Sequence, residues 1–380
     1  MKKIIKAFSI LLVLNAWFLP QLKAQEVITS KFSSDAWKVE ASKSEFTTIE
    51  GKECLYLENG SAHLDGSDFK MGIIEYEVMF QPGRKFAGIQ FRIQDAGNHE
   101  EFYMRAHQSG NPDATQYTPV YNGMAGWQLY YGEGYSTACS YNFGTWIQVK
   151  LIVTEKSMDV YVDDMSQPLL QVHDLKRTPE SGMIGFWSLL GGAWYARLSY
   201  QSMDSPPPLT QTLKKRIPPE GTISDWEVSS AFNAKDLAPF YALDDFKGMD
   251  QLIWQTLPVE YSGTVNLAQI SPVTQTTNTV LVKTTIHSKL NQILKMDFGY
   301  SDDAILYVNG KVLYSGQRRF LSRDYRYLGT IGYFDAAYLP LKEGENEVVF
   351  AITGGGGGWG IKAKLETLEG ITMARTSSHF

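Results

Sequence analysis

Long polar and charged side chains alternate with apolar ones along two neighbouring segments, residues 86–94 and 101–107. The polar positions are Gln90, Arg92, Gln94, Glu101, Tyr103, Arg105 and His107. Because successive side chains of a β-strand point to opposite faces, we expect all seven on one face of a sheet. Amide, guanidinium, phenol and imidazole groups together suit a ligand that has many hydroxyl groups and flat C–H faces, such as a sugar.

A later segment, GWQLYYG, is expected to add Gln128 and Tyr130 from another strand to this face. A simpler alternative is a polar sheet face held together by cross-strand ion pairs, such as Glu101 with Arg92 or Arg105. The binding hypothesis is favoured because two arginines, a tyrosine and a histidine exceed what solubility requires.

The strands that position these side chains are predicted from alternation and turn residues. The two segments flank a polar turn at 95–99, which predicts a β-hairpin. Further strands are predicted at 72–80, 146–162, 183–187 and 193–200, with no sustained helical period between residues 30 and 200. Many short antiparallel strands at this spacing indicate a sandwich.

The order of these segments resembles the concanavalin A-like lectin/glucanase sandwich, in its laminin G-like branch. The matching residues are Trp146, Val149, Lys150 and Val153, then 160–163 (VYVD), then 182–186 (GMIGF). This resemblance implies a curved sheet whose concave face commonly binds carbohydrate. It covers about 170 residues and concerns mostly core positions, so it indicates the fold more firmly than the chemistry.

Catalysis has less support. The glucanases of this fold carry an E-x-D-x-x-E motif, and no segment here matches it, so the enzyme question stays open. Glu100, Glu101, Asp113 and Glu133 are carboxylates near the expected cleft, although lone surface carboxylates are usually solvated. If the chain is an enzyme, we expect a glycoside hydrolase, for instance one resembling the 3-keto-disaccharide hydrolases.

A proline-rich stretch at 201–221 predicts a semi-rigid linker, and a second β-rich region follows. Asn309-Gly310 predicts a type I′ hairpin, since both residues tolerate positive φ. The order YVNGK, YLPLKEGENEV and a glycine-rich turn resembles the galactose-binding-like jelly roll found beside many glycosidase domains. Residues from 370 on are expected to form a loose tail.

The second region offers two further candidates. Trp359 follows five glycines and could stack on a sugar, although a flexible turn is the simpler interpretation. Asp302 and Asp303 could ligate calcium, but a capped turn is favoured, so no metal or other cofactor is predicted.

The composition of the chain and its first residues indicate where the protein is located and which partners are disfavoured. Residues 1–24 have the three parts of a secretory signal peptide, which predicts export to the periplasm or the extracellular space. Its removal takes away four lysines and no acids, so the formal charge moves from −6 to −10, which disfavours nucleic acid as a partner. No later segment is apolar enough to span a membrane. The two cysteines, Cys54 and Cys139, are either bridged or free.

The sequence therefore predicts an all-β protein with two sandwich domains, a concanavalin A-like one at 25–200 and a galactose-binding-like one at 222–369. Its expected role is recognition of a glycan on the concave face of the first domain, with Trp359 as an accessory contact. The alternatives are a glycoside-cleaving enzyme and a structural or adhesive surface module.

Overall fold

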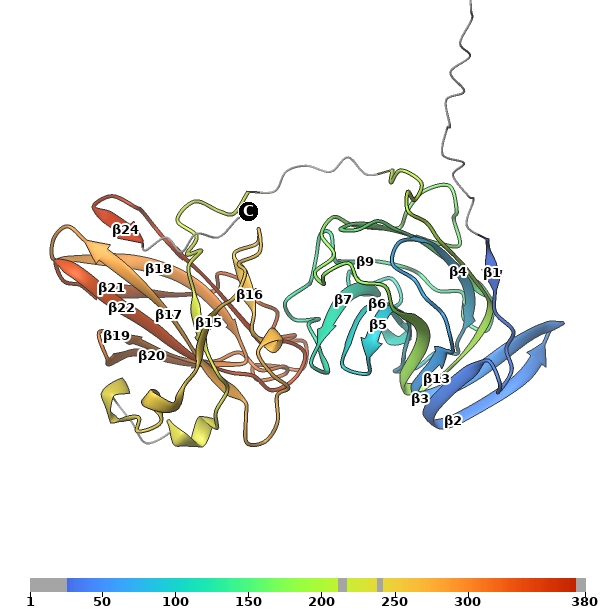
Figure 1. Ribbon diagram of the computed structural model, residues 1–380, viewed down its shortest axis with the longest axis horizontal. Helices are drawn as coiled ribbons and strands as arrows, with labels where there is room; N and C mark the ends of the chain where they lie inside the picture. The colour runs from blue at the N-terminus through green and yellow to red at the C-terminus, as the bar shows by residue number, and fades with distance from the viewer. Residues whose placement is uncertain (1–25, 211–216, 238–241, 374–380) are drawn as a thin grey trace, which may run out of the picture.

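The computed structural model describes residues 26–210, 217–237 and 242–373. Its regular elements are β-strands and short 3-10 helices, which confirms the all-β prediction. Two β-sandwiches follow one another along the chain (Figure 1), called here the first sandwich (26–210) and the second sandwich (217–373). The predicted signal peptide lies outside the described residues. Among the residues that are described, no helix has the length and hydrophobicity to cross a membrane.

The first sandwich is built from one sheet that curls into two layers. Its strands are β1 (Ile28–Thr29), β2 (Trp37–Ile49), β3 (Lys52–Leu64), β4 (Gly72–Met79), β5 (Phe86–Asp95), β6 (Asn98–Arg105), β7 (Thr115–Tyr121), β8 (Met124–Ala125), β9 (Ser136–Thr137), β10 (Ile147–Val153), β11 (Met158–Val162), β12 (Leu170–Val172) and β13 (Met183–Ser202). The 3-10 helix η1 (Ala106–Gln108) follows β6.

Strand β13 connects the two layers. The sequence predicts two strands here, but the structure has one strand of 20 residues with register shifts at 188–192 and 196–199. Its first part pairs with β5 and its last part with β4, so one layer continues through β5, β6 and β7 and the other through β4, β10 and β11. The register shifts let the strand bend from one layer into the other.

The core of the first sandwich lies between these layers. Ile89 of β5 and Phe102 of β6 contribute from one layer, and Tyr76 and Val149 contribute from the other. Because side chains alternate along a strand, the residues of β5 and β6 between these core positions face away from the core, on the concave side of the layer.

The second sandwich packs a seven-stranded sheet on a four-stranded sheet. The first consists of β14 (Glu227–Ser229), β15 (Trp254–Thr256), β17 (Thr279–Ser288), β19 (Asp303–Val308), β20 (Lys311–Gln317), β22 (Gly344–Thr353) and β24 (Ile371–Met373). The second consists of β16 (Thr264–Asn266), β18 (Gln292–Ser301), β21 (Asp335–Leu341) and β23 (Gly360–Leu365). Its 3-10 helices are η2 (Ala234–Asp236), η3 (Leu243–Asp245), η4 (Met249–Gln251) and η5 (Leu267–Gln269).

Two local predictions in this sandwich can be compared with the structure. Asn309 and Gly310 both have positive φ, 49° and 76°, in the hairpin between β19 and β20, as a type I′ turn requires. The tail expected from residue 370 is not loose at its start, because Ile371–Met373 form β24 and pair with β17.

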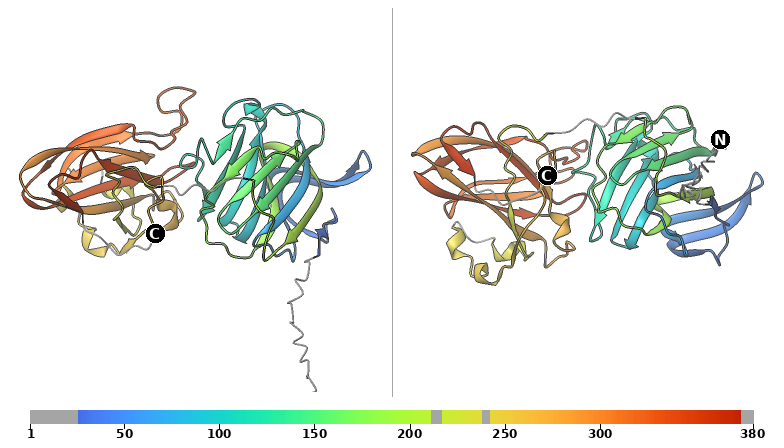
Figure 2. Two further views of the ribbon diagram at one scale, coloured as in Figure 1. Left: turned by 90° about the horizontal axis from the view of Figure 1, so that it is seen from above. Right: turned by 45° about the horizontal axis from the view of Figure 1, so that its top comes forward.

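The two sandwiches touch directly, end to end, and the β2/β3 hairpin projects from the opposite end of the first (Figure 2). Tyr121 and Met124 of the first sandwich pack against the core of the second. Tyr261 and Ile331 pack in return against the core of the first.

Candidate functional site

A cavity of about 1230 Å³ lies between the concave face of the first sandwich and the second sandwich. Strands β5, β6 and β13 supply its floor. The second sandwich contributes three loops: one between η5 and β17 that includes Val273, one between β20 and β21 that includes Phe320 and Tyr325, and one between β22 and β23 that includes Gly356. The face is therefore partly covered, but a space large enough for an oligosaccharide remains.

Five of the residues predicted for the site line this cavity together: Gln90, Glu101, Tyr103, Arg105 and His107. On β6 the alternation is as predicted, since Phe102, Met104 and Ala106 lie in the core on the other side. His107 follows β6 in η1, where burial and then the charges of Arg84 and Arg105 lower the pKa of its imidazole.

Arg105 is held in place by neutral acceptors. Its Nη1 donates to the main-chain oxygen of Asp113 at 2.7 Å, and its Nη2 donates to the hydroxyl of Tyr103 at 2.8 Å and to Oε1 of Gln116. The guanidinium carbon also lies 4.8 Å from the centre of the Tyr103 ring, a cation–π contact. Both side chains are therefore fixed before any ligand arrives.

Aromatic rings form a platform beside Arg105. Phe86 of β5 and Trp187 of β13 are stacked with ring centres 6.4 Å apart, and Trp187 also lies 5.4 Å from Tyr103. Gly88 makes room for this arrangement, because a Cβ there would come within 2.6 Å of the indole nitrogen. On the opposite wall, Trp127 meets Phe320 edge to face across the two sandwiches, at 5.6 Å.

His99 and Trp187 line the cavity although the sequence analysis did not select them. Alternation could have found both, because His99 is two residues before Glu101 and Trp187 follows the core residue Phe186. The amide nitrogen of Gln90 contacts Nε2 of His99 at 2.9 Å. Since an amide nitrogen only donates, Nε2 of His99 is the acceptor of this contact.

Two ring nitrogens of residues that line the cavity lack a partner. Within the described residues, neither Nδ1 of His99 nor Nε1 of Trp187 has a hydrogen-bond partner, although both atoms are buried. An unpaired buried polar group costs about 1–3 kcal/mol, and because both atoms are covered by protein, they do not face the open space of the cavity.

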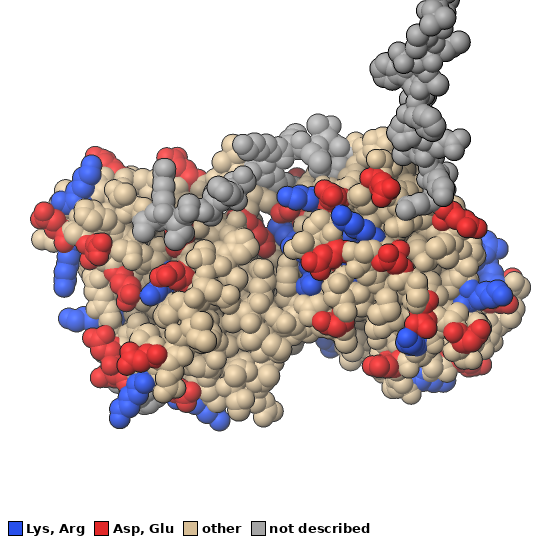
Figure 3. All heavy atoms as spheres, in the orientation of Figure 1, with Lys and Arg blue, Asp and Glu red and all other residues tan. Residues whose placement is uncertain are grey.

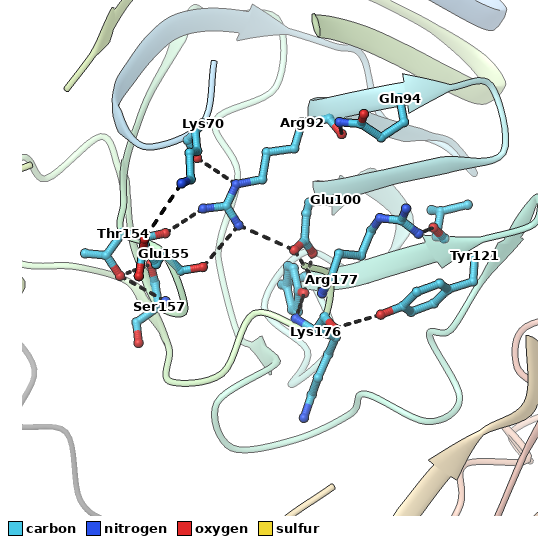
Figure 4. Close-up of polar contacts among 12 residues, drawn as sticks. Lys70, Arg92, Gln94, Glu100, Tyr121, Thr154, Glu155, Ser157, Lys176 and Arg177 are labelled. Carbon is cyan, nitrogen blue, oxygen red and sulfur yellow. Dashed lines mark hydrogen bonds and ion pairs between the residues drawn. The ribbon is translucent and has the colours of Figure 1, made fainter. Parts of the chain in front are cut away.

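Arg92 does not share the face of Gln90, contrary to the prediction. Its φ is +52° and the β5–β6 register shifts between Phe91 and Asp95, so the side chain turns to the other side of the layer. There it donates to the main-chain oxygens of Lys70 at 2.6 Å and Thr154 at 2.7 Å and lies 3.7 Å from Glu100 (Figure 4). Arg92 is thus part of a buried polar cluster.

Gln94 also lies outside the cavity. Its amide nitrogen lies beside the main chain of Arg92 (Figure 4) and donates to the main-chain oxygens of Arg92 at 3.3 Å and of Ser181 at 2.8 Å. The same bulge that turns Arg92 displaces Gln94 from the row begun by Gln90.

Gln128 and Tyr130 connect the two sandwiches. The predicted strand around them is a turn, 127–129, in which the amide nitrogen of Gln128 donates to the main-chain oxygen of Leu328 at 2.9 Å. The hydroxyl of Tyr130 donates to Glu260 at 2.6 Å. These residues hold the cavity walls together and do not line the cavity.

Trp359 is fully buried in the core of the second sandwich, where its indole nitrogen donates to the main-chain oxygen of Ile352 at 3.1 Å. It is therefore not exposed for stacking on a sugar. The preceding glycines do reach the cavity, since Gly355 and Gly356 line it.

The carboxylates considered for catalysis lie in different places. Glu101 and Asp113 line the cavity, whereas Glu100 is buried behind the sheet and Glu133 is exposed outside the cavity. Glu101 accepts a hydrogen bond from the hydroxyl of Thr118 at 2.8 Å and has His99 3.7 Å away.

The two cysteines and the acidic pair Asp302 and Asp303 have the following surroundings. Cys54 and Cys139 are free thiols. In the described part of the chain, no three His, Cys, Asp or Glu side chains are grouped as a metal site. Asp303 binds the guanidinium of Arg319, while Asp302 accepts from the Gly356 N–H at 3.2 Å and so holds the glycine loop.

Asp302 is expected to make stability depend on pH. Burial raises its pKa to about 6 from the ordinary 3.8, so the folded chain binds more protons than the unfolded chain between about pH 4 and pH 6. The contribution of Asp302 to stability therefore falls as pH rises through this window. Relative to the parent protein, Asp302→Asn should gain about 2 kcal/mol in unfolding free energy between pH 4 and pH 7.5, measured by urea unfolding. A difference that does not change with pH would contradict this assignment.

Comparisons with known proteins find likeness only in solved structures. No protein-family model matches the chain, and no curated protein does. The carbohydrate-binding module CBM66 from Bacillus subtilis is 15% identical, with 44% of this chain and 96% of the module covered at a TM-score of 0.36. A protein with a galectin-like fold from Bacillus subtilis is 11% identical, and the match covers 46% of this chain and 94% of that protein at a TM-score of 0.36. The β-glucanase of Bacillus licheniformis is 12% identical, and the match covers 46% of this chain and 97% of the glucanase at a TM-score of 0.33. None of these similarities identifies a ligand or a reaction for this chain.

Proposed function

We propose that this protein is an exported carbohydrate-binding protein that holds a glycan in the cavity between its two sandwiches. The supporting observation is the combination in one cavity of an aromatic platform, Phe86, Tyr103 and Trp187, with the polar side chains of Gln90, Glu101 and Arg105. Sugar rings offer flat C–H faces for stacking and many hydroxyl oxygens for donors. Export rests on the signal-peptide pattern of residues 1–24.

The second sandwich is proposed as part of the binding site as well as a packing partner. Phe320 and Gly356 line the cavity, and the contacts of Gln128 with Leu328 and of Tyr130 with Glu260 fix the two halves relative to each other. A purely structural or adhesive role is less favoured, because a face that served only for packing would be filled and would not border a space of about 1230 Å³.

Trp187→Ala tests this proposal. We expect binding to fall at least tenfold in a glycan-array screen followed by calorimetry, because a central aromatic contact of a ligand site contributes about 2 kcal/mol or more. Arg105 is a poorer first choice, since its three hydrogen bonds make loss of stability certain to accompany its removal.

Trp194→Ala is the matched control. Trp194 lies on the same strand, is half-buried, and packs on Tyr56 at 4.9 Å, but it does not line the cavity. Equal retention of glycan by the Trp187 variant and the Trp194 variant would place the site elsewhere.

Glycoside cleavage is the second candidate, favoured by one observation: the carboxylates of Glu101 and Asp113 border the same cavity, and His99 lies beside Glu101. Paired carboxyl groups are the usual means of cleaving a glycosidic bond. Incubating each retained oligosaccharide with the protein and measuring new reducing ends separates the two functions. Release that Glu101→Gln abolishes would establish the enzyme, and unchanged oligosaccharide would leave the binding protein.

A further inference from the structure

Arg105 differs from the other buried arginines in its partners. Three arginines are buried in the described part of the chain: Arg92, Arg105 and Arg318. Arg92 lies 3.7 Å from a carboxylate oxygen of Glu100, and Arg318 pairs with Asp335. Arg105 has no such ion pair within the described residues, and each of its three acceptors is neutral.

A buried guanidinium without a negative partner is costly, because the surrounding protein replaces water poorly as a solvent for charge. A guanidinium has five N–H groups, and the protein's acceptors account for three of those of Arg105. Since Arg105 borders the cavity, its charge faces a space that a ligand can enter.

The protein's own carboxylates near the cavity are not in place to neutralise Arg105. Asp113 binds Arg105 through its main-chain oxygen and forms no ion pair with it within the described residues. Glu101 is engaged by the hydroxyl of Thr118 and lies beside His99. The missing negative charge can therefore come from a ligand.

Two further arginines border the cavity, both exposed. Arg326 pairs with Asp324 at 3.6 Å, so Arg84 is the one that adds to the charge of Arg105. Arg84 and Arg105 lie close enough to His107 that their charges help burial to lower its pKa. This is a local feature, because the chain as a whole carries −6 and the face seen in Figure 3 mixes acidic and basic side chains. Positive charge at the cavity favours an anionic ligand over a neutral one.

We propose that the glycan bound in the cavity carries a carboxylate or sulfate group, and that Arg105 binds this group. The proposal rests on the function proposed above and specifies its ligand class. The planar guanidinium suits the paired oxygens of a carboxylate or sulfate, and the adjacent platform of Phe86, Tyr103 and Trp187 would support the sugar ring that bears it.

Matched oligosaccharides test the inference. One pair is tetragalacturonate and its methyl ester. The other pair is a sulfated galactan tetrasaccharide and its desulfated form. All four compounds are printed on a general glycan array. We expect the acidic member of one pair to bind about tenfold more tightly or better, as loss of a charge-assisted hydrogen bond predicts. Which pair shows the preference distinguishes a uronic acid from a sulfate ester.

Three variants locate the effect. Arg84→Gln, at an exposed position, should lower affinity for the acidic member about two- to fivefold with no change in melting temperature or in affinity for the neutral member. Arg105→Lys keeps the positive charge but loses the planar guanidinium with its paired N–H donors. Most of the preference for the acidic oligosaccharide should therefore disappear. Arg197→Gln is the control, because Arg197 is exposed on β13 and does not line the cavity.

The outcomes are distinguishable. Equal affinity for the acidic and neutral members of both pairs would overturn the anionic ligand and leave glycan binding intact. An acidic preference that survives unchanged in both the Arg84 and the Arg105 variants would likewise overturn it, since the anion would then bind elsewhere. Retention of no glycan at all would remove both the inference and the function on which it rests.

Discussion

Replacing Arg92 by alanine is expected to lower the free energy of unfolding by about 3–5 kcal/mol, the usual effect of removing one partner from a buried ion pair. Glu100 would stay buried without its cation, and the main-chain oxygens of Lys70 and Thr154 would lose their donor. Burial already raises the pKa of Glu100, and loss of Arg92 should raise it further. The effect can be measured by urea unfolding.

The pH dependence of this loss follows from the same carboxyl group. An acid with a raised folded pKa contributes stability below its unfolded pKa and loses that contribution as pH rises, so the Arg92→Ala deficit should be smaller at pH 5 than at pH 8. The double variant Arg92→Ala/Glu100→Gln should recover part of the deficit by removing the unpaired charge. A loss below about 1 kcal/mol, typical of an exposed pair, would contradict the assignment of this cluster to the interior.

Lys176→Ala is expected to destabilise the protein by a similar amount, about 3–5 kcal/mol, and to weaken the contact between the sandwiches. The ammonium, with its side chain 4% exposed, lies 2.6 Å from Asp174 and 2.7 Å from Glu260. Burial by itself lowers the pKa of Lys176, but Glu260, Tyr135 and Asp174 together outweigh it and hold the pKa well above its ordinary value. The rings of Tyr130 and Tyr261 lie within 5.5 Å of the same nitrogen.

Urea unfolding followed by tryptophan fluorescence and by circular dichroism measures this effect. Because Lys176 belongs to the first sandwich and Glu260 to the second, the two probes should report separate transitions in the variant. Lys38→Ala is the control, since Lys38 pairs with Asp65 at 2.5 Å on the surface and should cost at most about 1 kcal/mol. A Lys176 deficit no larger than the Lys38 deficit would show that the buried pair does not hold the interface.

The face of β6 could be predicted from sequence because nothing interrupts its alternation. Phe102 and Met104 enter the core, and Tyr103 and Arg105 border the cavity. The all-β class followed from the same two-residue period and from turn residues such as Asn309-Gly310. Where a strand is regular, the side-chain pattern in the sequence is enough to assign its two faces.

Prediction failed where the backbone left that period or where distant segments meet. Arg92 adopts positive φ in a bulge. Because positive φ is uncommon for residues other than glycine, the sequence does not indicate this conformation. Gln128 and Tyr130 are buried by contacts with Leu328 and Glu260, about 130 to 200 residues away, which alternation within one segment cannot reveal. The partial covering of the concave face also depends on contacts between segments far apart in the sequence, because the covering loops belong to the second sandwich.

The framework of the cavity and the loops that cover it belong to separate parts of the chain. The floor consists of paired strands, in which a change of length would alter the register of the whole sheet. The wall from the second sandwich consists of connections, residues 318–334 and 354–359, that lie outside any strand. Arg318 and Trp359 at the ends of these connections are buried in the second sandwich, but Phe320, Tyr325 and Gly356 border the cavity. Substitutions at these cavity-facing positions leave the paired strands intact, so they can change selectivity for the part of the ligand far from Arg105.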